Sequence, residues 1–402
     1  MLVVKKFGGS SVATPERILN VARRCKEEYD RGNEVVVVLS AMGDTTDDLI
    51  ALAKSVSKKP SKREMDMLYT VGEQTSVALL SMALQDMGIP AISLNAFQVA
   101  MHTNTDHMNA RLRKVDTSRI RHELDAKKIV VVTGFQGIDK YDDYTTLGRG
   151  GSDTTAVALA AVLHADECEI YTDVDGVYTA DPRIVENAVK LKEITYDEML
   201  DLATLGAQVL HNRSVEMAKK YRVQLVVRSS LNDEEGTVVK EKVKVEKMLI
   251  SGVTSDKSTS RISIIGLPDK PGVAFTIFRL LSKEGINVDM ILQSVGRENS
   301  KDISFTIPRE SLEDSLNIIE KNKESLEYIN VESEADVAKL SIVGAGMMSN
   351  PGVAAKMFEA LYNADINIKM IATSEIRISV LIDLDDVKRG VKVVHDAFEF
   401  ND

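Results

Sequence analysis

The chain has 402 residues, a length that predicts two or three domains. Hydrophobic residues make up 44% and charged residues 28%, the balance of a protein that folds and buries cores. Its 50 basic and 61 acidic residues leave a net charge of −11, which argues against nucleic acid or anionic lipid as a partner. No apolar run approaches the ~18 residues of a membrane span and no signal peptide is recognisable, so we expect a cytoplasmic protein without membrane contact. Cys25 and Cys168 lie in apolar stretches without CxxC spacing, which predicts two buried thiols in a reducing compartment.

The first 230 or so residues alternate short β-branched runs with longer segments of helical period. Runs such as Val35–Val38 are continuously apolar, as expected for strands covered on both faces of a mostly parallel sheet. The pattern predicts an open α/β sheet, whose ligands bind beyond the carboxyl ends of its strands. The expected strands are Leu2–Phe7, Val35–Leu39, Ile129–Thr133, Glu169–Thr172 and Val223–Arg228.

An internal repeat follows. Pro271–Ile291 and Pro351–Ile371 align without gaps at an offset of 80, and 10 of the 21 positions are identical. Each copy reads as a strand, a turn ending in Pro-Gly, a helix, two strands and a second helix, which is a split βαβ sandwich. The expected strands are Arg261–Gly266, Ile286–Leu292 and Ile303–Ile307 in the first copy, and Lys339–Gly344, Ile366–Ala372 and Arg377–Ile382 in the second.

The two copies differ in their fourth strand. The first copy has a candidate near Tyr328–Val331, whereas the second ends only a few residues after its last helix. The strand-like segment Met248–Thr254, ahead of the first copy, is therefore expected to complete the second, so that the repeats interleave. The resulting domains are 1–235, a linker at 236–247, a first repeat at 259–335, and a second repeat built from 248–258 plus 336–402.

Two glycine-rich turns are candidate anion sites. In Lys6-Phe7-Gly8-Gly9-Ser10-Ser11, after the first strand, two glycines let backbone N–H groups approach a phosphate while Lys6, as an exposed loop lysine, supplies charge. In the turn at residues 148–155, Ser152 is expected to cap a helix whose N-terminus follows Arg149. Each turn has a plain alternative: a tight connection in the first case, and a capped helix beside a solvated arginine in the second.

Metal sites are not favoured. The turn-rich segment at residues 171–183 lacks the third oxygen ligand and the closing glutamate of an EF-hand. His102 and His107 are five residues apart in a polar segment and match no metal motif, so we interpret them as solvated loop histidines.

Taken together, these motifs resemble the amino acid kinase family over the N-terminal part of the chain. Its members share the segment Thr-Asp-Val-Asp-Gly-Val-Tyr-Thr-Ala-Asp-Pro at 172–182. The segments at 6–11, 40–46, 72–73 and 149–153 are together typical of the aspartokinase branch, and the C-terminal repeats are similar to paired ACT domains. The resemblance implies an α/β fold: an N-terminal open, mostly parallel sheet sandwiched by helices, followed by two interleaved ferredoxin-like βαββαβ ACT domains.

The resemblance also implies an activity, the phosphorylation of the L-aspartate β-carboxylate by ATP with Mg²⁺, as the first step toward lysine, threonine and methionine. A carboxylate of pKa ~4 is already an anion at neutral pH, so no base has to remove a proton. What such a reaction needs is positioning and charge neutralisation. By motif position, the catalytic residues are Lys6, Asp153 and Arg149, with Asp153 orienting Lys6. The nucleotide is assigned to Lys6, Gly8, Gly9, Thr172, Asp173, Tyr178 and Arg183, and aspartate to Thr46, Glu73, Arg149, Gly150, Gly151 and Ser152.

In this family, ACT repeats bind end-product amino acids, so the resemblance implies lysine, threonine or both as effector. The first copy offers Asp269 and Asp289 where the second has Ser349 and Lys369, which makes the first the better site for an ammonium group. The second copy is expected to serve mainly as the packing partner in a homo-oligomer formed through the ACT domains. The expected effector residues are Asp269, Gly272, Val273, Ala274, Asn287, Asp289, Gln293 and Ser294, with Asn367 and Ile368 in the second copy.

Two other functions remain open from the residues alone. One is a kinase for another acid, such as glutamate; the other is an amino acid sensor whose kinase-like half is inactive. The intact set of Lys6, Asp153 and Arg149 argues against the sensor, and the 149–153 segment with its paired repeats argues against another acid.

Overall fold

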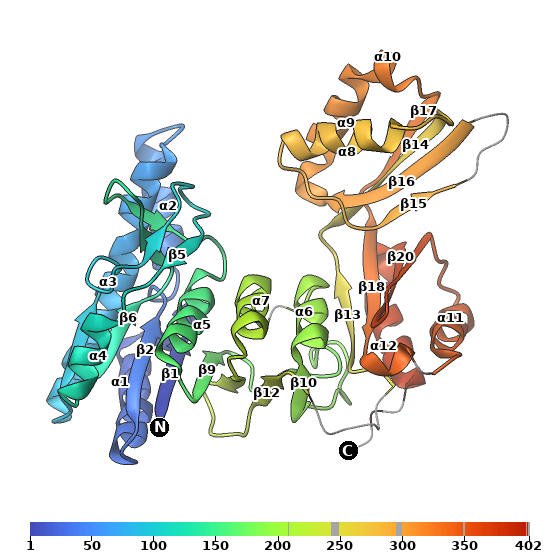
Figure 1. Cartoon of the computed structure of the whole chain (residues 1–402). Coiled ribbons are helices and arrows are strands. Elements are labelled where there is room, and N and C mark those ends of the chain that lie inside the picture. Colours follow the sequence, from blue (N-terminus) through green and yellow to red (C-terminus); the bar gives the residue numbers. More distant parts are fainter. Residues whose placement is uncertain (208, 243–248, 295–299, 349, 399, 401–402) are drawn as a thin grey trace. The chain divides into compact units, whose positions relative to one another are not determined.

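The computed structural model describes residues 1–207, 209–242, 249–294, 300–348, 350–398 and 400 (Figure 1). The chain divides into two compact units. The first unit holds the described residues within 1–177, 190–203 and 208–244, and the second holds those within 178–189, 204–207 and 245–402. Among the described residues, no helix is long and apolar enough to cross a membrane.

An eight-stranded sheet forms the core of the first unit, in the order β10-β12-β11-β9-β1-β2-β6-β3. At its centre, β1 (Leu2–Phe7) pairs in parallel with β2 (Glu34–Leu39) and β9 (Glu167–Thr172), and β2 pairs in parallel with β6 (Ile129–Thr133). The predicted continuous apolar strands are buried throughout, and the mostly parallel sheet is confirmed. The remaining strands are β3 (Ala91–Leu94), β10 (Glu193–Thr195), β11 (Leu225–Ser229) and β12 (Thr237–Lys240).

Helices cover both faces of this sheet. On one face, α1 (Pro15–Asp30) and α3 (Lys62–Asp86) pack apolar side chains against β1, β2 and β6. Pro15 occupies the first turn of α1, and Thr14 caps it by accepting from Arg17 N–H at 3.4 Å. On the other face, α5 (Gly151–Leu163) contacts β1, β2 and β9 and is buried almost all round. The other helices of this part are α2 (Thr45–Val56), α4 (Ser118–Asp125), α6 (Tyr196–Thr204) and α7 (Asn212–Tyr221).

Both cysteines are buried free thiols, as predicted. Cys25 belongs to α1 and lies in the core, and burial raises the pKa of its thiol to about 12. Cys168, in β9, also has a raised pKa because of its burial. Neither thiol is therefore ionised at neutral pH.

A small second sheet, β5-β4-β7-β8, was not predicted. Its strands have only two or three residues each, too few for a periodic pattern. They are β4 (His102–Thr103), β5 (Leu112–Lys114), β7 (Gln136–Ile138) and β8 (Tyr144–Thr146). The prediction of solvated loop histidines is wrong here, because His102 belongs to β4 and the half-buried His107 has its Nδ1 2.8 Å from the buried carboxylate of Asp66.

The second unit contains the two predicted repeats, each with a four-stranded antiparallel sheet. The first sheet has the order β15-β16-β14-β17 and the second β13-β18-β20-β19. The first repeat comprises β14 (Thr259–Pro268), α8 (Val273–Lys283), β15 (Ile291–Gln293), β16 (Ser300–Pro308), α9 (Leu312–Lys321), α10 (Lys323–Leu326) and β17 (Asn330–Glu334). The second comprises β18 (Val337–Val343), α11 (Val353–Asn363), β19 (Met370–Thr373), β20 (Arg377–Asp383) and α12 (Val387–Ala397).

The interleaving of the repeats is confirmed. The strand β13 (Gly252–Asp256), which precedes the first repeat, pairs antiparallel with β18 of the second, from Gly252 opposite Val343 to Asp256 opposite Lys339. In the first repeat, β17 holds the equivalent edge beside β14. Met248, where we expected this strand to begin, lies outside the described residues.

The expected domain boundaries need two changes. The expected linker at 236–247 contains β12, which pairs with β10 and β11 in the large sheet. Residues 178–189, expected in the kinase domain, pack in the second unit, where Ala180 and Val185 join the core of the second repeat and Val253 N–H donates to Thr179 O at 2.7 Å. The placement of β12 and of residues 178–189 depends on contacts between segments distant in sequence, which leave no local pattern from which they could be predicted.

Candidate active site

The side chain of Lys6 is the cation at the centre of the predicted site. Lys6 lies in β1, opposite Val38 of β2 and Ile170 of β9, and its Nζ is 2.7 Å from Oδ1 of Asp153 in the first turn of α5. Both residues are only 9% exposed. Lys6 is therefore a buried strand residue, and its prediction as an exposed loop lysine is wrong. The ion pair compensates two charges that would be costly to bury alone.

Gly8 and Gly9 let the chain after β1 pass close to the loop after β2. A Cβ on Gly9 would lie 2.9 Å from the carbonyl oxygen of Ala41, closer than packed atoms approach. Gly43 N–H donates to Gly9 O at 3.1 Å, and Gly8 N–H donates to Tyr171 O at 3.3 Å. The turn at Gly8 and Gly9 is thereby fixed beside the loop that leads to Thr46 in the first turn of α2.

The second glycine-rich turn begins α5. Gly150 has φ +67°, and a Cβ there would lie 2.2 Å from His211, so this position requires glycine. The helix starts at Gly151 with Gly150 at the N-cap position, so the prediction of Ser152 as the cap is wrong by two residues. Ser152 and Asp153 lie in the first turn, where backbone N–H groups have no partner within the helix and favour an anion.

Arg149, just ahead of this turn, is exposed. Its guanidinium makes no hydrogen bond or ion pair with any other residue that the structure describes. Its five N–H donors are therefore available to a ligand beside the start of α5.

Glu73 is a second buried carboxyl group among the predicted site residues. It lies in α3, is 4% exposed, and accepts from Gln136 Nε2 at 3.3 Å and from the backbone N–H of Ala41. Burial raises the pKa of its carboxyl group to about 7, although these hydrogen bonds favour the charged form. Sequence reasoning missed Gln136 and also His211, because a single polar residue after an apolar strand, or at the start of a helix, carries no pattern of its own.

The expected nucleotide residues fall in two places. Thr172 ends β9 and Asp173 follows it in the first unit, with Thr172 Oγ1 donating to Asp173 Oδ1 at 2.9 Å. Tyr178 and Arg183 belong to the second unit, where the Arg183 guanidinium pairs with Asp181 at 2.9 Å.

In the repeats, Gly272 and Gly352 occupy the same left-handed conformation ahead of α8 and α11, with φ +96° and +101°. Asp289 is exposed but has a partner, because its carboxylate pairs with Lys339 of the second repeat. Asp269 pairs with Lys301 at 3.1 Å. The remaining expected effector residues range from buried to exposed: Val273 is buried, Ala274 and Ile368 are half-buried, and Asn287, Gln293, Ser294 and Asn367 are exposed.

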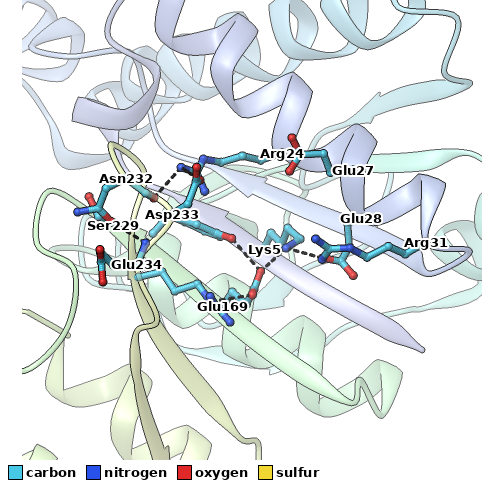
Figure 2. Close-up of a pocket in the computed structure, with 12 residues that line it drawn as sticks. Lys5, Arg24, Glu27, Glu28, Arg31, Glu169, Ser229, Asn232, Asp233 and Glu234 are labelled. Atoms are coloured by element: carbon cyan, nitrogen blue, oxygen red, sulfur yellow. Dashed lines mark hydrogen bonds and ion pairs between the residues drawn. The ribbon is translucent and has the colours of Figure 1, made fainter. Parts of the chain in front are cut away.

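A cavity of about 220 Å³ lies beside β1 and α1 (Figure 2). Its lining contains none of the predicted site residues. Successive side chains of a strand point to opposite faces of a sheet, so Lys5 lines this cavity while Lys6 points to α5 on the other face. Lys5 Nζ is 3.0 Å from Glu28 of α1 and also pairs with Glu169, which Arg228 contacts at 3.0 Å. These paired charges tie α1 to the sheet, and we assign the cavity no ligand.

A cluster of metal-ligand atoms involves none of the predicted site residues. Among the described residues, His107, Asp139 and Asp143 offer ligand atoms within 4.8 Å of one another. Each already has a partner: His107 contacts Asp66, Asp143 pairs with Arg63, and Asp139 accepts from the N–H groups of Tyr141 and Asp143. Their hydrogen bonds explain the cluster without an ion.

The comparisons with known proteins agree with this geometry. Residues 1–229 match the amino acid kinase family, and residues 262–322 and 340–398 match an ACT domain. Over 401 residues, the chain is 51% identical to an aspartokinase of Bacillus sp. (strain MGA3), covering 100% of this chain and 98% of the relative.

Two solved structures of E. coli aspartokinase III match the whole chain at 25% identity. The complex with aspartate and ADP (R-state) has a TM-score of 0.84 and coverage of 99% of both chains. The complex with lysine and aspartate (T-state) has a TM-score of 0.77 and coverage of 100% of both. Full-length identity of about one half, a matching fold and the Lys6–Asp153 pair lead to one conclusion: the chain belongs to the amino acid kinase family and, within it, to the aspartokinases.

Proposed function

We propose that the pair of Lys6 and Asp153 is the phosphoryl-transfer centre of this aspartate kinase. An oxygen of the aspartate β-carboxylate attacks the γ-phosphorus of ATP, the bond to the β–γ bridging oxygen breaks, and 4-phospho-L-aspartate and ADP result. Lys6 neutralises charge on the transferred phosphoryl group, and Asp153 holds the ammonium of Lys6 in place. Gly8 and Gly9 lie beside it; the N–H of Gly8 donates to Tyr171 O, so the N–H of Gly9 is the one we assign to a phosphate oxygen. The observation that carries the proposal is the buried 2.7 Å contact between these two side chains at the first turn of α5.

The substrate aspartate is assigned to groups that surround the same helix start. Arg149 has free donors for a carboxylate, and Ser152, Gly150 and Gly151 present the positive end of α5. Thr46 supplies a hydroxyl from the first turn of α2, and Glu73 faces the ammonium group. Release of ADP in a coupled assay with aspartate, with glutamate or with no acid tests this assignment: only aspartate should support turnover.

The nucleotide is assigned to Thr172, Asp173, Tyr178 and Arg183. We place Mg²⁺ with the nucleotide, because no cluster of three free carboxylate or histidine ligands lies at this site among the described residues, and Mg²⁺ is usually held by phosphates, water and one or two carboxylates. When bound, the ion neutralises charge on the β- and γ-phosphate oxygens. The two buried free thiols fit a reducing, cytoplasmic setting.

The pH dependence of aspartate binding follows from Glu73. Its pKa of about 7 means that the carboxylate is largely ionised above pH 7 and protonated below it. An ammonium group binds the ionised form, so we expect the KM for aspartate to rise about tenfold per pH unit below pH 7. The KM for ATP should change much less over the same range. Initial rates from pH 5.5 to 8.5, with each substrate varied in turn, measure both constants; a flat aspartate profile would contradict the role of Glu73.

We further propose lysine as a feedback effector bound by the first repeat, since the E. coli relative is solved with lysine. Asp269, Gly272, Val273, Ala274, Asn287, Asp289, Gln293 and Ser294 form this site, with Asn367 and Ile368 from the second repeat. The contact of Asp289 with Lys339 means that the effector ammonium has to share or replace an existing partner.

Asp289→Ala tests this effector site. The variant should keep aspartate kinase turnover and show at least tenfold weaker inhibition by lysine, because allosteric coupling of about 1–3 kcal/mol is lost with the effector's contacts. Lysine is titrated from micromolar to millimolar concentration at fixed substrates. Lys339→Ala is the matched control, since it removes the partner of Asp289 and leaves the acid; it should bind lysine at least as tightly as the parent. Equal inhibition of parent and Asp289→Ala would place the effector site elsewhere.

The repeats also carry a surface for a second copy of the chain. The edge strands β15 and β19 expose Ile291, Leu292 and Ile371, each about half accessible. We propose that these edges are covered in a homo-oligomer formed through the ACT domains. Sedimentation equilibrium of the intact chain tests this, because a monomer at micromolar concentration would contradict it.

A further inference from the structure

Gln136 is a fully buried polar residue that no assignment above uses. It begins β7 at 0% exposure, directly after the strand β6 and the turn at Gly134 and Phe135. Its side-chain Nε2 donates to two oxygens of α3: the carbonyl of Thr70 at 2.8 Å and the carboxylate of Glu73 at 3.3 Å. Gln136 is the side chain that the structure places on the Glu73 carboxylate.

The carbonyl oxygen of the same side-chain amide, Oε1, makes no comparable contact. Gln136 Oε1 is buried and has no hydrogen-bond partner among the described residues. A buried acceptor without a partner costs free energy, and an apolar side chain of the same size would avoid that cost. Packing alone therefore does not explain a glutamine here, whereas the two bonds made by Nε2 do.

The surroundings of Glu73 leave few other groups to set its charge. Its carboxyl group receives hydrogen bonds from its own backbone N–H, from Gln136 Nε2 and from the backbone N–H of Ala41, and no charged side chain among the described residues contributes to its ionisation. Burial in α3 favours the neutral acid, and the donors favour the carboxylate. Ser76 lies one turn further along α3. Its hydroxyl donates to the backbone carbonyl oxygens of Ser40 and Glu73 and not to the Glu73 carboxylate.

We propose that Gln136 is a positioning residue for aspartate recognition, which holds Glu73 ionised and oriented toward the substrate ammonium through the Nε2 bond. This inference rests on the proposed role of Glu73 as the ammonium ligand. It assigns Gln136 to substrate affinity rather than to the phosphoryl-transfer step. Losing the bond should raise the pKa of the Glu73 carboxyl group by about one unit, because a hydrogen bond donated to the charged form lowers that pKa.

Gln136→Met is the primary test, because methionine fills the space and offers no N–H. The inflection in the pH profile of the aspartate KM should move about one unit toward alkaline pH, and the KM at pH 7 should rise about fivefold. The kcat at saturating aspartate and the KM for ATP should stay within twofold of the parent. Ser76→Ala is the matched control: it also removes buried hydrogen bonds of α3, and its inflection should stay at the parent value.

Calorimetry gives a readout that a purely structural role would not change. Aspartate binding to the intact enzyme with ADP, measured at pH 7 in two buffers of different ionisation heat, reports the protons released when Glu73 ionises. The parent should release about half a proton, and Gln136→Met should release nearly one, because more of its Glu73 starts protonated. If Gln136→Met fails to fold, Gln136→Glu replaces it; two carboxyl groups in contact cannot both ionise easily, so its inflection should move further upward.

The outcomes separate this inference from the proposed function. Glu73→Gln should abolish the inflection and raise the aspartate KM; if it does neither, Glu73 is not the ammonium ligand and the assignment of the substrate site fails. If Glu73→Gln behaves as expected but the glutamine variants keep the parent inflection and proton release, only the role of Gln136 is overturned.

Discussion

Replacing Lys6 with methionine is expected to lower kcat by about 10²-fold or more, because it removes a positive charge from the site where negative charge is redistributed in the transition state. Methionine keeps the apolar stem that β1 buries beside α5. The KM values for both substrates should change less than kcat, since the interaction is strongest in the transition state. Steady-state rates with each substrate varied, together with circular dichroism, provide the measurement.

The ion pair requires a control for stability. Removing Lys6 leaves the buried carboxylate of Asp153 without its partner, which we expect to cost about 3 kcal/mol in the free energy of unfolding. The double variant Lys6→Met/Asp153→Asn should recover much of that stability and none of the activity. Lys59→Met, at an exposed lysine between α2 and α3, should match the parent in both. Near-normal kcat in a folded Lys6→Met variant would contradict the catalytic assignment.

Arg149→Lys is expected to lower kcat/KM for aspartate by ~10²-fold, although the charge is kept. A guanidinium binds a carboxylate through two parallel N–H bonds, whereas an ammonium group is a point charge that does not reproduce that geometry. Misplacement of the substrate by about 1 Å is enough for a loss of this size. Because Arg149 is exposed and has no partner among the described residues, the variant should fold with unchanged stability.

The assignment of Arg149 to aspartate is tested by comparing the loss of kcat/KM for aspartate with the loss of kcat/KM for ATP. Rates are measured with aspartate varied at saturating ATP, and then with ATP varied at saturating aspartate. The loss should appear in the first series and be small in the second. The opposite pattern would assign Arg149 to the nucleotide. Arg213→Lys serves as a comparison, since the guanidinium of Arg213 donates to the backbone carbonyls of Leu147 and Ala110.

Local features of the sequence determined most of the fold. Continuous apolar runs such as Val35–Leu39 identify buried parallel strands because both faces of such a strand are covered, and β2 differs from the expected strand by one residue. The repeat at Pro271 and Pro351 identifies two copies of one unit, and a missing edge in the second copy identified the strand that crosses over to it. Periodicity and counting suffice where the signal lies within a few consecutive residues.

The candidate site was predicted only in its parts. The glycines and charged residues of the motifs carry local requirements, such as the left-handed conformation of Gly150 and the close approach at Gly9. Whether the side chain of Lys6 is exposed or buried depends on α5, which begins about 145 residues later in the chain. The tertiary structure decided this, because the ion pair with Asp153 forms only when β1 and α5 are packed together.

The tertiary structure alone also decided the partners of the buried polar groups. Glu73 comes from α3 and Gln136 from β7, so neither the raised pKa of the acid nor the hydrogen bond that opposes it has a local sequence signal. The same holds for Asp289, which the sequence presents as a free acid and the fold pairs with Lys339 of the second repeat. The sequence by itself determined which residue types and turns were present. Burial and long-range contact determined their charge and partners, because the free energy of an ionisable group depends on what surrounds it in space rather than along the chain.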